Sequence, residues 1–136
     1  VGKFDSSEIK DKATEIPVVE RNRRLSIFLD SLMTLWTGGK QTNILSDISP
    51  KFIVFSFQTV KLPFLLEAVS CDTKGKVDAA KLLDSLSNYS TVTTQVIIGT
   101  TGVIDSSEIE AITKDDIQIL PIAEAFARVK ETLFKL

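Results

Sequence analysis

A helix pattern that leads within a few residues into a strand pattern constrains this chain more than any other feature. From Glu20 onward, apolar residues recur at spacings of three and four, which predicts a helix over residues 20–36. KFIVFSFQT, at residues 51–59, has the aromatic and β-branched content of a mostly buried strand. The apolar helix face comprises Leu29 and five side chains that we expect to pack against Ile53 and Phe55 in one core: Leu25, Phe28, Leu32, Met33 and Trp36.

A polar segment with two glycines, TGGKQTN at residues 37–43, separates the helix pattern from the strand pattern. Gly38 is placed to cap the C-terminal end of the helix. Glycines also permit close approach of a backbone, Lys40 offers a positive charge, and Gln41 and Asn43 can hydrogen-bond to phosphate, ribose or base edges. Spacing alone does not decide between a helix cap followed by a polar loop and a contact to RNA.

The middle of the chain predicts a strand, a capped helix and a hairpin. FLLEAVS, at residues 64–70, predicts a strand after Pro63. TTQVIIGTTGVID, at residues 93–105, predicts a hairpin whose loop is set by Gly99 and Gly102. Asp78 is placed to cap a short helix with one apolar side, made of Ala79, Leu82, Leu83 and Leu86.

The two ends of the chain complete the predicted elements. VGKF, at residues 1–4, resembles the end of a strand, and residues 5–19 form a charged linker without periodicity. Near the C-terminus, a short strand at residues 117–120 leads into a helix that starts at Pro121, where proline is tolerated in the first turn. The fold class is α/β or α+β. The last helix buries Ile122, Ala125, Phe126, Val129 and Leu133.

Composition sets the broad class of protein. The 136 residues, 43% hydrophobic and 25% charged, are typical of a single globular domain. A net charge of -2 gives no overall basic field that would indicate nucleic-acid binding. The positive part is local: residues 31–61 carry Lys40, Lys51 and Lys61 against Asp47 alone.

The sequence contains neither a leader pattern nor an apolar run of about 18 residues, so we expect a cytoplasmic protein without a membrane anchor. The first methionine, Met33, falls inside the predicted helix. We therefore expect this chain to be a fragment of a longer one.

Side chains for common catalytic chemistry are scarce. The chain has no histidine, which excludes histidine-based general bases, triads and histidine metal sites within it. We interpret Cys71 as a small core residue and not as a nucleophile. The acidic pairs at residues 108/110 and 115–116 are interpreted as surface or capping residues. We expect no enzymatic activity, no metal and no cofactor.

DSSEI occurs twice, at residues 5–9 and 105–109. Serine or aspartate followed three residues later by glutamate is a capping-box pattern that arises independently at helix starts. We prefer that interpretation to an internal duplication, because the flanking sequences do not align.

One ordered block of residues resembles a known family. In ERNRRLSIFLDSLMTLWTGGKQTNILSDISPKFIVFSF, residues 20–57, a basic-flanked helix leads to a glycine pair, a basic-polar loop, an L-x-D-x-S-P segment and an apolar strand. This order resembles the backbone subunit of type I CRISPR Cascade complexes, also labelled the DevR or CRISPR-associated autoregulator family. Weaker similarity continues through PFLLEAV, GKVDAAKLLDSL and ILPIAEAFARVKETL. The resemblance covers most of this chain and about the second half of a typical member.

The resemblance implies the second half of a modified ferredoxin-like core of the RNA-recognition type, in an α+β fold. Residues 1–61 would close that core, and residues 62–136 would form an α/β extension packed on it. Family members polymerise along a guide RNA (crRNA) and present it for pairing with target DNA. The implied RNA-binding residues are Gly38, Gly39, Lys40, Gln41, Thr42 and Asn43.

The implied partners are the crRNA, neighbouring copies of the subunit, other Cascade subunits, target DNA through the guide, and the N-terminal half of the chain itself. No membrane partner is implied. Two alternatives stay open. One is a backbone subunit like those of type III complexes, with metal-dependent RNA cleavage, for which Asp30 and Asp47 would need to face a metal and the scissile phosphate. The other is an RNA-free regulatory or interaction domain.

Overall fold

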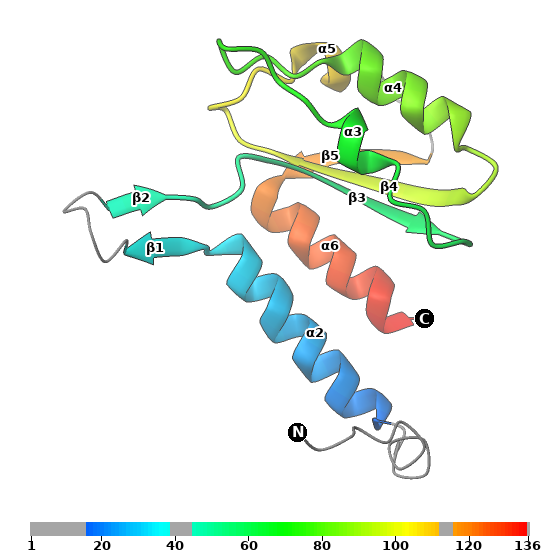
Figure 1. Ribbon diagram of the computed structural model, residues 1–136. Helices are drawn as coiled ribbons and strands as arrows, with labels where there is room; N and C mark the ends of the chain where they lie inside the picture. Colours follow the sequence, from blue (N-terminus) through cyan, green and yellow to red (C-terminus); the bar gives the residue numbers. More distant parts are fainter. Residues whose placement is uncertain (1–15, 39–44, 112–115, 136) are drawn as a thin grey trace, which may run out of the picture.

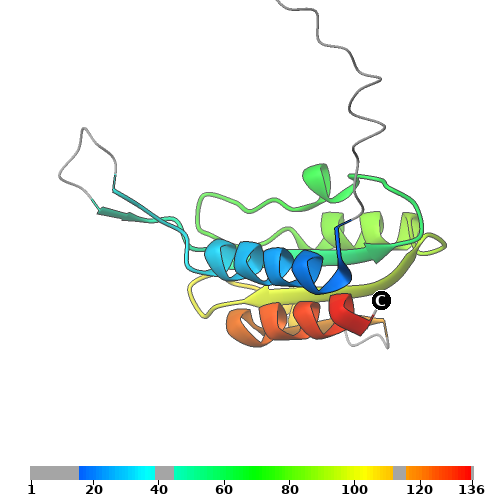
Figure 2. The ribbon, with the colours of Figure 1, turned by 90° about the horizontal axis from the view of Figure 1, so that it is seen from below.

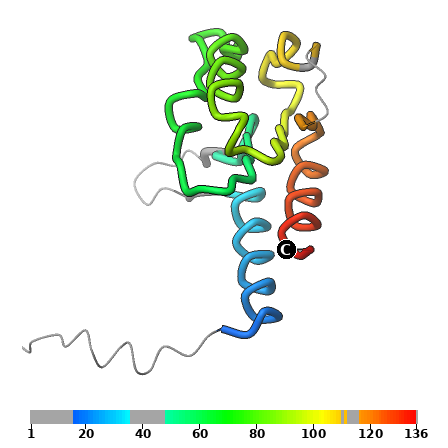
Figure 3. The backbone as a smooth tube through the Cα atoms, turned by 90° about the vertical axis from the view of Figure 1, so that its right-hand side faces the viewer, coloured from blue at the N-terminus to red at the C-terminus, as the bar shows by residue number. Residues whose placement is uncertain are grey.

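The structure, a computed structural model, describes residues 16–38, 45–111 and 116–135. These residues form an α+β fold in which helices cover both faces of a three-stranded sheet (Figures 1 and 3). The strands are β3 (Phe52–Gln58), β4 (Thr93–Thr100) and β5 (Ile117–Pro121). The predicted strand at residues 1–4 lies outside the described residues.

The sheet is mixed, with the order β3-β4-β5. β3 runs antiparallel to β4, with Phe52 opposite Thr100, and β5 runs parallel to β4, with Val96 opposite Ile117. Within the described part of the chain, β3 pairs with β4 alone, so its other edge carries no strand. The central strand is the most buried one, since Val96 to Gly99 are all inaccessible to solvent or nearly so.

Two long helices cover one face of the sheet. α2 (Val18–Met33) and α6 (Ile122–Lys135) lie side by side and run in opposite directions (Figure 2). Their buried side chains and Ile97 of β4 form what we call the α6 core. The ring of Phe55 meets that of Phe126 edge to face there, with centroids 5.3 Å apart. The buried members of the α6 core are Leu29, Ile97, Ala125, Phe126 and Val129.

The other face carries α3 (Leu65–Ala68), α4 (Ala79–Asn88) and α5 (Ser107–Glu110). Their apolar residues pack with β4 and β5 in what we call the α4 core. Side chains alternate along a strand, which is why adjacent Ile97 and Ile98 enter different cores. The buried members of the α4 core are Ala68, Val77, Ala79, Leu82, Leu86, Val96, Ile98, Ile109 and Ile117.

Several predicted elements are confirmed. The strand expected at residues 51–59 is β3, and the strand expected at 117–120 is β5. The carboxylate of Asp78 caps α4 by accepting a hydrogen bond from the backbone N–H of Lys81 (3.0 Å). The final helix begins directly after Pro121 and buries or half-buries all five residues expected of it.

Two strand predictions are wrong. FLLEAVS forms the one-turn helix α3, because leucine, glutamate and alanine favour helix and only Val69 is β-branched. Residues 93–105 form no hairpin: β4 continues through Gly99 and ends at Thr100. A Cβ on Gly99 would lie 2.9 Å from the Cβ of Ala125 in α6. This glycine therefore allows α6 to approach the sheet and does not make a turn.

The predicted first helix is also corrected. α2 ends at Met33, and the backbone N–H and hydroxyl of Thr34 both donate to the carbonyl of Asp30, so Gly38 is not the cap. Leu32 and Met33 do pack with Ile53 and Phe55 as expected. Phe28 does not, since it is 61% exposed and Leu29 takes the inward position. The face of α2 is rotated because its main packing partner is α6.

Candidate functional site

Of the predicted RNA-binding residues, the structure describes Gly38, which is the last residue of a strand in a small strand pair. β1 (Trp36–Gly38) and β2 (Leu45–Asp47) pair antiparallel and extend away from the three-stranded sheet (Figures 1 and 2). In their register Gly38 lies opposite Leu45. The other predicted residues, Gly39, Lys40, Gln41, Thr42 and Asn43, lie outside the described residues.

The segment that follows β2 is bonded to the loop after β4. The carbonyl of Lys51 accepts hydrogen bonds from the backbone N–H (3.0 Å) and the hydroxyl (3.2 Å) of Thr101. The ammonium of Lys51 donates to the hydroxyl of Ser49 (2.9 Å). The β1–β2 pair is thereby connected to the edge of the sheet at which β4 and β5 end.

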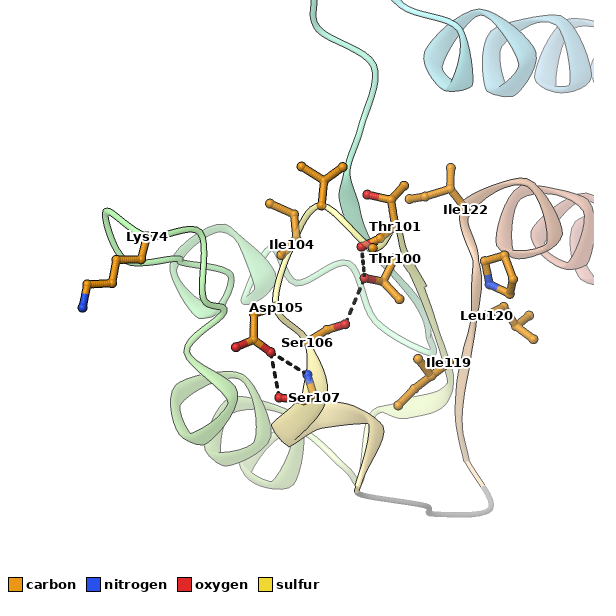
Figure 4. A pocket seen from close by; sticks show the side chains of 13 residues that line it. Lys74, Thr100, Thr101, Ile104, Asp105, Ser106, Ser107, Ile119, Leu120 and Ile122 are labelled. Carbon is orange, nitrogen blue, oxygen red and sulfur yellow. Dashed lines mark hydrogen bonds between the residues drawn. The ribbon is translucent and has the colours of Figure 1, made fainter.

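An open pocket of about 970 Å³ lies at that edge (Figure 4). β4 and β5 are parallel, so both present their carboxyl ends to it, which is where open sheets commonly bind ligands. Its walls combine apolar side chains with hydroxyls and one carboxylate. The lining residues come from three segments: Lys74, residues 100–107 and residues 119–122.

Hydrogen bonds order the polar wall of the pocket. The hydroxyls of Thr100 and Ser106 lie 3.0 Å apart, and Ser106 is buried. One carboxylate oxygen of Asp105, Oδ1, accepts from the backbone N–H (3.2 Å) and the hydroxyl (2.7 Å) of Ser107. These hydrogen bonds lower the pKa of Asp105, so its carboxylate is charged at neutral pH.

The backbone of Asp105 is held on both sides by a neighbouring turn. Its N–H donates to the carbonyl of Gly75 (3.2 Å), and its carbonyl accepts from the N–H of Val77 (3.1 Å). Gly75 has a φ of 80°, a conformation that side chains disfavour. Asp72 Oδ1 accepts from two backbone N–H groups of the same turn. The position of Asp105 is therefore strongly constrained.

Sequence reasoning missed this pocket, although signals were present. DSSEI was interpreted as a helix cap, and Asp105 does accept a hydrogen bond two residues on, at the start of α5. Glu108 does not complete a capping box, since it pairs with the ammonium of Lys76 (2.6 Å). Because a hairpin was expected over residues 93–105, the sequence analysis did not predict that the residues after β4 lie at the end of a buried strand with a parallel neighbour.

Other candidate residues are dispersed. Cys71 is exposed and not a core residue, because it pairs across a turn with Val77, which takes the buried position. Asp30 accepts from Ser26 and forms an ion pair with Lys130 of α6, and the side chain of Asp47 is not described. Among residues 16–38, 45–111 and 116–135, no three aspartate, glutamate or cysteine side chains lie close enough together to hold a metal ion. None of the helices in those ranges has the length and apolar character of a membrane span.

The first turns of α2 carry the densest positive charge that the structure describes. Arg23 and Arg24 both bond to the carboxylate of Glu20 at 2.7 Å, and Arg21 is exposed beside them. Hydrogen bonds from Arg23 and then Arg24 lower the pKa of Glu20 to about 2. Two of the three arginines are thus partly neutralised by a neighbour on the same helix.

No protein-family model, curated protein or solved structure matches this chain. Fold and site therefore rest on the chain's own residues and geometry.

Proposed function

We propose that this chain is the C-terminal part of a guide-RNA-binding backbone subunit of a type I CRISPR Cascade complex. The observation that carries the proposal is the succession of α2, the β1–β2 pair and β3 over residues 18–58. In the sequence, Gly39, Lys40 and Gln41 come between Gly38 and Leu45, which lie opposite each other in β1 and β2. In the proposed function, the GGKQ segment contacts the backbone of an RNA strand.

In this function the protein binds the sugar-phosphate backbone and leaves sequence recognition to base pairing. Such a division suits a subunit that must accept any guide. Contacts through backbone N–H groups of glycines, the ammonium of Lys40 and the amide of Gln41 carry no sequence information. The subunit acts without catalysis, by holding crRNA and presenting it to target DNA.

The proposed fold is the second half of a ferredoxin-like core. Among the described residues β3 pairs with β4 alone, and both faces of β3 are apolar, with Phe52, Ile53, Val54 and Phe55 all half-buried. An edge of this kind favours pairing with a further strand. In the proposed subunit the N-terminal half of the chain supplies that strand, and neighbouring copies and other Cascade subunits assemble around the completed core.

The test measures RNA binding by the full-length subunit over a range of salt concentrations, with two guide RNAs of unrelated sequence. Lys40→Ala should weaken binding of both guides equally and lower the salt slope by roughly one, because one phosphate contact is lost. Lys61→Ala is the matched control, since Lys61 is an exposed lysine outside the GGKQ segment. Equal affinity and slope for folded Lys40→Ala and wild-type protein would refute the proposal for this segment.

A further inference from the structure

The pocket at the ends of β4 and β5 has two kinds of wall. Ile104 lies on one side and Ile119 and Ile122 on the other, with the hydroxyls of Thr100 and Ser106 between them (Figure 4). Ligand pockets usually measure roughly 300–1,000 Å³, so one of about 970 Å³ has ample room for a nucleoside. A nucleoside matches these walls, because it joins a flat, largely apolar base to a sugar rich in hydroxyls.

Asp105 provides the most selective group in the pocket. Its Oδ1 is occupied by Ser107, while Oδ2 accepts no hydrogen bond from any described residue. Figure 4 shows this second oxygen turned away from Ser107. A charged carboxylate can only accept, so the ligand must bring a donor. A ribose 2′-hydroxyl is such a donor, and 2′-deoxyribose lacks this hydroxyl.

The charges of the lining disfavour two simpler ligands. A bare phosphate brings a negative charge, which the Asp105 carboxylate would repel. The cation in the lining is Lys74, which is exposed at the outer rim. A metal ion would need several oxygen ligands, and the described residues of the lining offer one carboxylate.

We propose that this pocket binds one ribonucleotide of an RNA strand, with Asp105 Oδ2 accepting a hydrogen bond from the ribose 2′-hydroxyl. The inference rests on the proposed function. Thr101 of the pocket donates two hydrogen bonds to the carbonyl of Lys51, which follows β2 along the chain and so connects the pocket to the β1–β2 pair. In this proposal the RNA strand that contacts the GGKQ segment also passes through the pocket. Asp105 then makes the subunit prefer RNA to DNA.

The first experiment compares a single-stranded RNA 12-mer with the DNA of the same sequence, using Asp105→Asn in the full-length subunit. Asparagine keeps Oδ1 as the acceptor for Ser107 and replaces Oδ2 by an N–H donor. RNA affinity should fall about tenfold, while DNA affinity should stay equal or rise because a negative charge is removed. Parallel changes for RNA and DNA would overturn the assignment.

Glu108→Gln is the matched control. It removes the same charge from a neighbouring carboxylate that lies on α5, pairs with Lys76 and does not line the pocket. Its effect on RNA and DNA should be equal. A loss of RNA preference in Glu108→Gln as large as in Asp105→Asn would reduce the effect to general electrostatics and overturn the proposal.

A second measurement needs no variant and separates this inference from the proposed function. Uridine 5′-monophosphate and its 2′-deoxy form are titrated into the isotope-labelled subunit, and amide shifts are followed by NMR. The ribose form should shift Thr101 and Asp105 more strongly, and the RNA 12-mer should displace it. Absent shifts with intact, Lys40-dependent RNA binding would overturn the pocket and leave the function standing. Ribose-selective shifts together with an inert Lys40→Ala would support the pocket and refute the role of the GGKQ segment.

Discussion

At the scale of single residues, Gly99 decides how closely the sheet and α6 can pack. A Cβ at this position would lie 2.9 Å from both the Ala125 Cβ and the Ile53 Cγ2, which is well inside van der Waals contact. Gly99→Ala should therefore lower the free energy of unfolding by about 1–3 kcal/mol, as overpacking of a core does. The measurement is the midpoint of denaturant unfolding, with the m-value checked for constancy.

Gly102→Ala serves as the control for this prediction. A Cβ on Gly102 has no neighbouring atom within 4 Å, and the substitution is the same in chemistry. It should change stability by no more than about 0.5 kcal/mol. Equal effects of the two substitutions would show that α6 is packed more loosely on β4 than in this structure.

At the scale of elements, Leu29 is the buried contact of α2, whereas the helix pattern predicted that Phe28 would pack in the core. Leu29 is 5% exposed in the α6 core, whereas the larger Phe28 beside it is 61% exposed. Leu29→Ala should cost about 2–5 kcal/mol, because it leaves a cavity between α2, α6 and β4. Thermal and denaturant unfolding of the full-length protein test this value.

Phe28→Ala should cost far less than Leu29→Ala. The ring loses little buried area, so its effect should lie near that of an ordinary surface substitution, within about 0.5 kcal/mol. A loss for Phe28→Ala that equals or exceeds the loss for Leu29→Ala would mean that another part of the full-length protein covers this side of α2.

The sequence predicted the long elements better than the short ones. α6 and α4 repeat a strong apolar period and have a clear start at Pro121 and Asp78, so local signals sufficed. α3 is one turn long, and Gly99 acts through Ala125, which is distant along the chain. Long-range packing of that kind leaves no periodic trace, although a lone glycine in a β-branched run does indicate close approach.

The candidate sites differ in the same way. The GGKQ segment was found because its residues are contiguous, and of them the structure describes only Gly38. The pocket was missed because its walls come from three separate segments that only the parallel pairing of β4 and β5 brings together. A prediction of parallel pairing between residues 93–100 and 117–121 would have located it.

At the scale of the whole molecule, β4 joins the two cores. Ile97 enters the α6 core and Ile98 enters the α4 core, and neither is accessible to solvent. Each core has apolar residues from elements before and after β4 along the chain. Because one strand forms the centre of both, we expect the two layers of helices to unfold together.

Ile97→Ala and Ile98→Ala test this coupling. Each should lower stability by about 2–5 kcal/mol through a cavity in a different core. In native-state hydrogen exchange, either substitution should reduce the protection of slowly exchanging amides in both α4 and α6 by the same free energy, since both open only in the global transition. Wild-type protein at matched denaturant concentration gives the reference opening energies. If Ile98→Ala weakened protection in α4 while α6 kept its wild-type protection, the helix layers would be separate cooperative units, and β4 would be a shared boundary and not the common centre of one fold.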